Sequence, residues 1–190
     1  KEKKVFLLGY STGLPIALSA AALVDRPVRI AGMSPAVECG GGAETTARTI
    51  RLLAKAVVRA RSLRLRPVWL AYYQALLFGE RVWTDAALSA RAVEIIAARR
   101  DRIVFPDGGR PKAHTSDLRR WDLPDGARFK RGQVRFFWGA EDPVFSRAQI
   151  ERFAARVGPA DVTVYPGHGH LLFATQSVVF DDILAFFGGE

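Results

Sequence analysis

A serine stands between two glycines in the segment Gly9-Tyr10-Ser11-Thr12-Gly13. Val5–Leu8 just before it is a bulky apolar run that predicts a fully buried parallel strand, and an Ala/Leu-rich helix is expected over 11–24. A tight strand-to-helix turn, with both glycines allowing close packing, would expose Ser11 near the positive end of the helix. We therefore predict that Ser11 is a nucleophile and that the Thr12 backbone N–H donates to an oxyanion; a purely structural turn is the alternative.

Two acidic residues, Glu141 and Asp142, follow a third predicted strand, Val134–Trp138. An acid just beyond the carboxyl end of a strand can orient an imidazole. We choose Asp142, which precedes Pro143, and keep Glu141 as its competitor. In the alternative interpretation, both acids are solvated residues at the start of a helix.

Two of the three histidines lie in the segment 165–170, Tyr-Pro-Gly-His-Gly-His, after a predicted strand over 162–165. From such a loop a histidine can reach back to a serine at the end of another strand, and His170 is our predicted base. His168 is the second candidate, and His114 is a poor third. The His-x-His pair could instead bind a metal, but no further ligand cluster accompanies it, so we expect neither a metal nor a cofactor.

The elements that would position these residues alternate between strands and helices, which predicts α/β structure with a parallel sheet of about four strands. The chain between 40 and 131 is too long for a simple crossover and carries helical patterns over 45–63, 68–78 and 86–100, then a loop over 105–132. We expect this helical insertion to be a lid over the carboxyl ends of the strands, where open α/β sheets bind ligands. Residues 1–39 and 132–190 would form the core, with a helix over 147–157 and the last helix spanning 172–187. Asp85 is expected to cap the helix over 86–100.

Three segments, GYSTG, WGAEDPV and PGHGH, each follow a predicted strand and place Ser11, Asp142 and His170 in that order. In these features the chain resembles the α/β-hydrolase superfamily, serine hydrolases with a lid. The resemblance implies that Ser11 attacks an acyl carbon, that His170 shuttles the proton and that Asp142 fixes the imidazole tautomer. A serine at the turn argues against members that use aspartate there, such as haloalkane dehalogenases and epoxide hydrolases.

The same resemblance implies that this chain is the C-terminal part of the fold. The serine turn of the family follows its fifth strand, so four N-terminal strands and the loop with a second oxyanion donor would be missing. The serine strand would then be a sheet edge. We expect the 190 residues alone to be weakly active or inactive, with a possible need for the missing N-terminal half.

The resulting prediction is a serine hydrolase that cleaves a carboxylic ester or related small acyl substrate through an acyl-enzyme. Acyl transfer to another acceptor, or cofactor-free peroxidase chemistry on the same triad, is a close relative of that reaction. A non-catalytic binding protein that keeps the fold is the alternative from another class.

Composition narrows the function classes. The chain has 190 residues, a formal net charge of +9 and 49% hydrophobic residues, which is typical of a globular domain. It shows no membrane-spanning run and no signal-peptide pattern, and its single cysteine, Cys39, fits a reducing compartment, so we expect a cytoplasmic protein.

A basic stripe and an aromatic cluster mark the helical insertion. The stripe is expected to be a solvated face, although it could attract an anionic substrate, a membrane surface or nucleic acid. Because no nucleic-acid-binding motif accompanies the stripe, we expect no nucleic-acid partner. The aromatic residues of 69–83 are expected to pack among the helices; in the alternative interpretation, some of them line a substrate pocket. The stripe consists of Arg48, Arg51, Lys55 and Arg59.

Overall fold

Four parallel strands form the sheet of the computed structural model, which describes residues 3–37, 42–103, 120–124 and 129–189. The strands lie side by side in chain order, so every carboxyl end reaches the same edge of the sheet. The parallel α/β sheet predicted from the sequence is therefore confirmed. The strands are β1 (Val5–Tyr10), β2 (Val28–Met33), β3 (Val134–Gly139) and β4 (Asp161–Tyr165).

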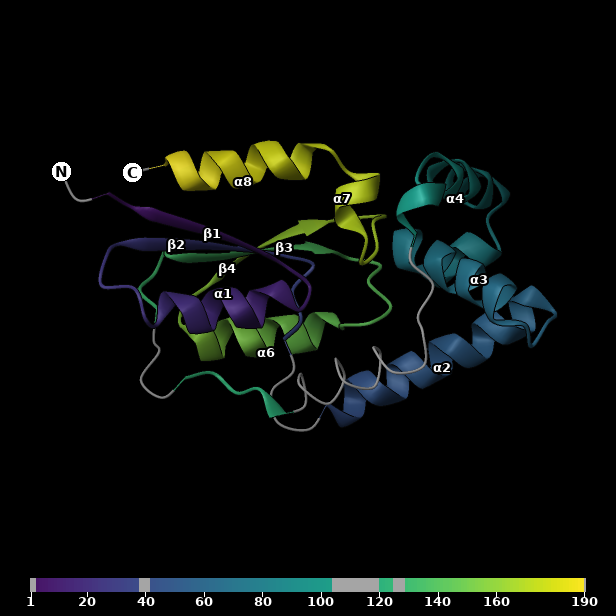
Figure 1. Ribbon diagram of the computed structural model, residues 1–190, viewed down its shortest axis with the longest axis horizontal. Coiled ribbons are helices and arrows are strands. Elements are labelled where there is room, and N and C mark those ends of the chain that lie inside the picture. The colour runs from purple at the N-terminus through teal and green to yellow at the C-terminus, as the bar shows by residue number, and fades with distance from the viewer. Residues whose placement is uncertain (1–2, 38–41, 104–119, 125–128, 190) are drawn as a thin grey trace.

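Helices cover both faces of the sheet (Figure 1). Helices α1 (Gly13–Ala21) and α6 (Arg147–Val157) cover one face, and α8 (Val178–Gly188) covers the other. Successive side chains of a strand point to opposite faces, which gives each face its own apolar core. Toward α1 and α6 the fully buried residues are Leu14, Leu18, Ile30, Phe136, Ile150 and Val157. Toward α8 the buried residues include Ala31, Met33, Phe137, Val179 and Ile183.

Strand β1 lies at the edge of the sheet and pairs only with β2 in the described part of the chain. The prediction of a fully buried strand was wrong, because Phe6 is 46% exposed and Leu8 is 47% exposed. Both belong to the face that carries α8, where the Phe6 ring lies 5.1 Å from the Phe187 ring. The expected edge position of this strand is confirmed, and the edge remains open to solvent on the α8 face.

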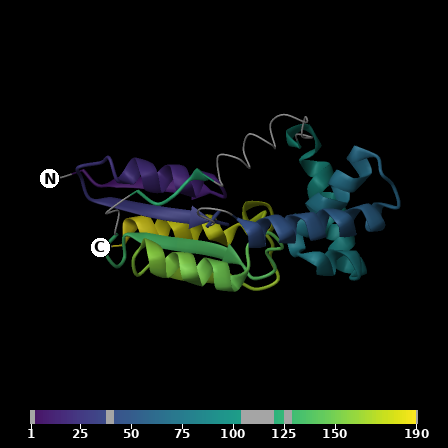
Figure 2. The ribbon, with the colours of Figure 1, turned by 90° about the horizontal axis from the view of Figure 1, so that it is seen from below.

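The helices between β2 and β3 lie beyond the carboxyl ends of the strands, away from the sheet core (Figures 1 and 2). They pack on one another around Leu52, Leu77 and Val82, which are almost completely buried. We call residues 43–102 the helical region. It contains α2 (Ala43–Ala60), α3 (Leu65–Phe78), η1 (Glu80–Trp83), α4 (Ala86–Ala98) and η2 (Arg100–Arg102).

The helices predicted over 45–63 and 68–78 begin two or three residues earlier than expected, at Ala43 and Leu65. Two other predicted helices differ for reasons visible in the backbone. The first begins at Gly13 instead of residue 11, because Ser11 has a left-handed φ of 48° that no right-handed helix accommodates. The closing helix is broken into α7 (Leu172–Thr175) and α8, because Gln176 is extended. Within the described ranges no helix is both long and apolar enough to cross a bilayer. Cys39, His114 and most of the expected loop over 105–132 lie outside the described residues.

Candidate active site

Ser11 occupies the turn between β1 and α1. Its φ of 48° is unusual for a residue with a side chain and costs about 1 kcal/mol or more, so neighbouring contacts must hold it. The Ser11 N–H donates to the Met33 carbonyl (3.0 Å) at the end of β2. The Ser11 carbonyl accepts from the Leu14 and Ala36 N–H groups, at 3.1 Å each. These three bonds tie the turn to the neighbouring strand and to the start of α1.

The two glycines that flank the turn are not equivalent. A Cβ on Gly9 would lie 2.6 Å from the backbone N and Cα of Leu14, so Gly9 allows α1 to pack directly on β1. A Cβ on Gly13 would meet nothing within 4 Å. The expectation that both glycines serve close packing is therefore correct for Gly9 and wrong for Gly13.

The His170 imidazole lies between the Ser11 hydroxyl and the Asp142 carboxylate. Its Nδ1 is 2.7 Å from Asp142 Oδ2, and its Nε2 is 3.0 Å from Ser11 Oγ. An ionised carboxylate only accepts hydrogen bonds, so Nδ1 carries the proton and Nε2 accepts from the Ser11 hydroxyl. The ring is flanked by Tyr10 and Phe145, whose ring centroids lie 5.8 and 5.9 Å away. These contacts restrict the imidazole to the orientation that joins serine and acid.

The Asp142 side chain is fully buried, and among the described residues its hydrogen bonds come from its own loop and from His170. Its Oδ1 accepts from the Val144 N–H (2.7 Å) and the Phe145 N–H (3.1 Å), which leaves Oδ2 for the imidazole. Burial of a carboxylate requires such partners. Glu141 instead points toward Arg81, 3.9 Å away, and is one third exposed. The structure thus brings Asp142, and not Glu141, to His170.

His168 faces away from the serine. Its Nδ1 lies 2.9 Å from the Thr175 hydroxyl, which connects the loop to α7. Burial, and secondarily the charge of Arg91, lower the pKa of His168 below 6.5. A shared metal site for His168 and His170 receives no support, since in the described ranges no three His, Cys, Asp or Glu side chains gather.

The carboxyl end of α3 supports the histidine loop, a contact that sequence reasoning missed. The Gly169 N–H donates to the Leu77 carbonyl (2.8 Å), and the Leu171 N–H donates to the Leu76 carbonyl (2.9 Å). A Cβ on Gly169 would lie 2.5 Å from the Leu76 carbonyl oxygen, so this approach requires glycine. His170 is thereby held on both sides by the helical region. The segment PGHGH was visible in the sequence, but its partner helix was not.

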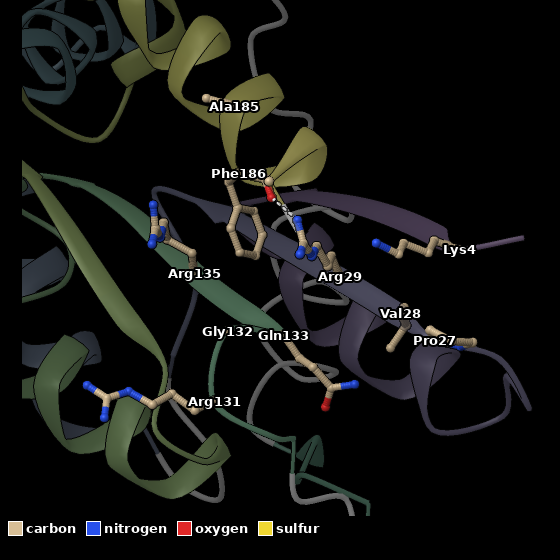
Figure 3. Close-up of a pocket in the computed structure, with 11 residues that line it drawn as sticks. Lys4, Pro27, Val28, Arg29, Arg131, Gly132, Gln133, Arg135, Ala185 and Phe186 are labelled. Atoms are coloured by element: carbon tan, nitrogen blue, oxygen red, sulfur yellow. Dashed lines mark hydrogen bonds between the residues drawn. The ribbon is translucent and has the colours of Figure 1, made fainter. Parts of the chain in front are cut away.

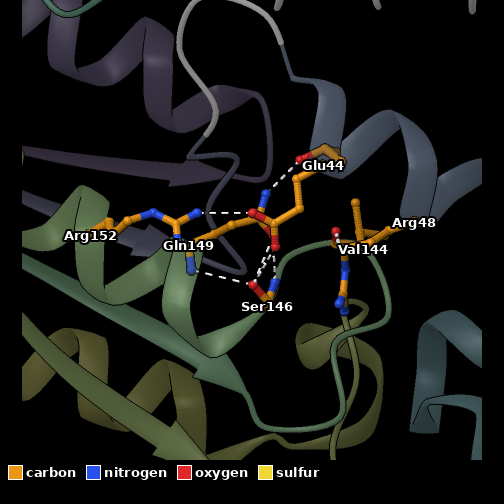
Figure 4. Close-up of polar contacts among 7 residues, drawn as sticks. Glu44, Arg48, Val144, Ser146, Gln149 and Arg152 are labelled. Atoms are coloured by element: carbon orange, nitrogen blue, oxygen red, sulfur yellow. Dashed lines mark hydrogen bonds and ion pairs between the residues drawn. The ribbon is translucent and has the colours of Figure 1, made fainter.

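The start of α2 supports the loop that carries Asp142. Arg48 donates from Nε to the Val144 carbonyl (3.2 Å) and from Nη2 to the Asp142 carbonyl (3.3 Å). Glu44, one turn earlier, accepts from Ser146 Oγ (3.1 Å) and pairs with Arg152 of α6 (2.9 Å), as Figure 4 shows. The prediction of a solvated basic face was therefore wrong for Arg48.

A cavity of about 510 Å³ opens beside His170, within the size range of small-molecule sites. Its lining residues include His170, Tyr10 and Phe173, and others come from the helical region and from Ile103. Burial, and then the charge of Asp142, raise the pKa of Tyr10 far above 10, so its phenol stays neutral. Among the aromatic residues of 69–83, Tyr73 lines the cavity.

A second cavity, of about 600 Å³, lies at the amino ends of the strands, far from the serine turn (Figure 3). Its cationic lining residues are Lys4, Arg29, Arg131 and Arg135. Arg29 donates to the Phe186 carbonyl (2.7 Å), so its guanidinium completes the hydrogen bonding at the end of α8. None of the predicted site residues lines this cavity.

Comparisons with known proteins agree with this architecture. The sequence model of the alpha/beta hydrolase family matches residues 1–182. A search of curated proteins found no match. Among solved structures, Rv0554 from Mycobacterium tuberculosis is 16% identical, with a TM-score of 0.64 over 96% of this chain and 64% of that protein.

Two esterases of known structure are similar as well. A thermophilic esterase from Thermogutta terrifontis is 17% identical, with a TM-score of 0.57 over 97% of this chain and 64% of its own. The esterase EaEST from Exiguobacterium antarcticum is 16% identical, with a TM-score of 0.58 over 96% of this chain and 66% of its own. At these identities the likeness concerns the fold, and this chain spans 64–66% of the length of the three proteins.

Proposed function

The chain belongs to the alpha/beta hydrolase family, and we propose that it is a serine hydrolase that cleaves a carboxylic ester or a related acyl substrate. The observation that carries this proposal is the hydrogen-bonded series from Ser11 through His170 to Asp142, with distances of 3.0 and 2.7 Å. Serine, imidazole and acid in this order of contact are what nucleophilic acyl transfer requires.

In the proposed reaction, Ser11 Oγ attacks the acyl carbon while His170 Nε2 takes the hydroxyl proton. The tetrahedral intermediate collapses when His170 returns that proton to the leaving alcohol, and an acyl-serine remains. Water then attacks the acyl carbon with the same imidazole as base, which releases the acid and restores Ser11. Asp142 holds the Nδ1–H tautomer and stabilises the imidazolium formed in each half of the reaction.

The negative oxygen of the intermediate is assigned to the Thr12 N–H, at the start of α1, where the positive end of the helix dipole adds to the stabilisation. We assign a single donor from this chain. An oxyanion hole that has a second donor is faster by about 10²–10³ in kcat, so slow turnover is expected from the 190 residues alone.

The division of the chain follows the same logic. We propose that residues 1–39 and 132–190 carry the reacting groups and that residues 40–131 act as a lid that shapes the substrate cavity. The support is the cavity beside His170, whose lining comes from both parts, together with the bonds from Arg48 and from the end of α3 to the loops of Asp142 and His170.

The test is pre-steady-state hydrolysis of p-nitrophenyl butyrate by the wild-type chain and by the Ser11→Ala and Ser89→Ala variants. An acyl-enzyme predicts a burst of nitrophenol that approaches one equivalent of protein. The burst should vanish in Ser11→Ala and persist in Ser89→Ala, whose altered side chain lies on α4. Equal release by Ser11→Ala and wild type would refute the proposal. A burst followed by continued release only in the presence of an added alcohol acceptor would instead indicate an acyltransferase, because the acceptor acts on the acyl-serine after nitrophenol has left.

A further inference from the structure

We propose that the cavity beside His170 accepts an acyl group whose far end carries a negative charge, such as the free carboxylate of a dicarboxylic acid monoester. This inference rests on the proposed function, because it assigns the substrate class of the same site. It starts from two guanidinium groups in the cavity wall, those of Arg99 and Arg102. Both belong to the segment that follows α4, at the edge of the helical region.

The rest of the cavity wall is mostly apolar. Aliphatic side chains from the end of α4 and from the end of α3 face Phe173 across the cavity. Such a wall fits the methylene groups of an acyl chain. The aliphatic lining residues are Leu76, Leu77, Ile95, Ile96, Ile103 and Leu171.

The guanidinium groups of the two arginines have no partner in the part of the chain that the structure describes. Neither group forms a hydrogen bond or an ion pair there, and Asp101, between the two residues in the sequence, pairs with neither. Two other cations of the helical region are engaged, since Lys55 pairs with Glu80 and Arg48 binds backbone carbonyls. Arg99 and Arg102 are therefore available to a ligand.

The charged side chains among the described lining residues of the cavity are positive. The described residues that line it include two guanidinium groups and no carboxylate, and the buried Asp142 is occupied by His170 and two backbone N–H groups. A guanidinium has donors only and matches a carboxylate in geometry. The wall is thus complementary to an anion and not to a cation.

Exposure places the charged end of the ligand at the mouth of the cavity. Arg102 is exposed and Arg99 is half-buried, whereas Leu76 and Leu77 deeper in the wall are buried. A carboxylate held at the mouth keeps part of its hydration, so its binding is not opposed by full desolvation. The acyl chain would then run inward along the aliphatic wall, with the ester carbonyl at Ser11.

Binding of two primary amides of equal length tests this inference. Octanamide ends in a methyl group, and the monoamide of octanedioic acid ends in a carboxylate. Both are titrated calorimetrically into the Ser11→Ala chain, which removes turnover from the measurement. A part-exposed charge pair is worth up to roughly fivefold in affinity, so two arginines predict a preference of about tenfold for the carboxylate ligand. The preference should shrink as salt is added.

The same preference should largely disappear in a chain that also carries Arg99→Gln and Arg102→Gln. Arg100→Gln is the matched control, because Arg100 is exposed and does not line the cavity. Equal affinity for the two amides, no binding of either, or a preference that survives the double substitution would overturn the inference. The proposed hydrolysis is judged separately by the nitrophenol burst, which uses an uncharged ester and the intact serine.

Discussion

Replacing Gly9 with alanine should strongly destabilise the fold, because the new methyl group would meet backbone that cannot swing aside. The added Cβ would lie 2.6 Å from Leu14 N and Cα, whereas ordinary contact begins at 3.4 Å, so α1 must retreat by about 0.8 Å. Leu14 and Leu18 are fully buried on that helix and would lose part of their contact with the sheet. A gap of this size forfeits about a quarter to a half of the dispersion energy of the affected contacts. Together these effects predict a loss of about 3 kcal/mol in the free energy of unfolding.

The matched control is Gly13→Ala, on the other side of Ser11, where a Cβ meets nothing within 4 Å. Gly13 is the first residue of α1, and alanine there should raise the free energy of unfolding by about 0.5 kcal/mol. Urea unfolding followed by circular dichroism measures both changes. With an m-value of about 2 kcal/mol/M, the midpoint of Gly9→Ala should fall by about 1.5 M. If Gly9→Ala unfolds within 0.3 M of wild type (roughly 0.6 kcal/mol), or if Gly13→Ala is equally damaged, the packing argument fails.

Three further predictions concern the site. Asp142→Asn would present an amide N–H₂ to His170 Nδ1 and favour the wrong tautomer, so kcat in ester hydrolysis should fall by about 10⁴-fold; a fall below tenfold contradicts the assigned role. Arg48→Gln removes the hydrogen bonds to the loop that carries Asp142 and should lower the free energy of unfolding in urea by about 1–2 kcal/mol. Arg51→Gln, on the exposed side of α2, should lower it by less than about 0.5 kcal/mol. Equal losses in the two variants would show that the Arg48 contact does not stabilise the loop. The lowered pKa of His168 means that the unfolded chain binds a proton there before the folded chain does, so stability should fall as the pH drops from about 6.5 through the folded-state pKa. His168→Gln should lose less stability than wild type between pH 7.5 and 5.5, and an equal loss would contradict the assignment.

Local pattern was sufficient to predict the elements that carry the site. The helix over 147–157 was predicted with its observed bounds, and the capping box between Ser146 and Gln149 explains its sharp start. Asp85 caps α4 as expected, by accepting from the Ala87 and Leu88 N–H groups. Strand positions followed from apolar runs ended by glycine or proline. Burial of β1 could not be predicted this way, because it depends on whether a neighbouring strand exists.

The meeting of Ser11, Asp142 and His170 could be predicted from the sequence, but the contacts that support their loops could not. Parallel strands end at one edge of the sheet, which explains why Ser11, Asp142 and His170 meet although they are far apart in sequence. The contacts of Arg48 and of the end of α3 depend on how the helical region docks on the sheet. Helical periodicity identifies the faces of a helix but not the loop that each face contacts. For the same reason, the position of Arg99 in the cavity wall could not be predicted from the sequence.

Labelling of the folded chain with a fluorophosphonate, followed by mass spectrometry of the intact protein and its peptides, shows directly whether Ser11 is an activated nucleophile. We expect one adduct, located on Ser11, absent in Ser11→Ala and formed much more slowly in His170→Gln, because the imidazole activates the hydroxyl. A folded chain that forms no adduct, or an adduct on Ser11 that forms equally fast in His170→Gln, would contradict this role of Ser11.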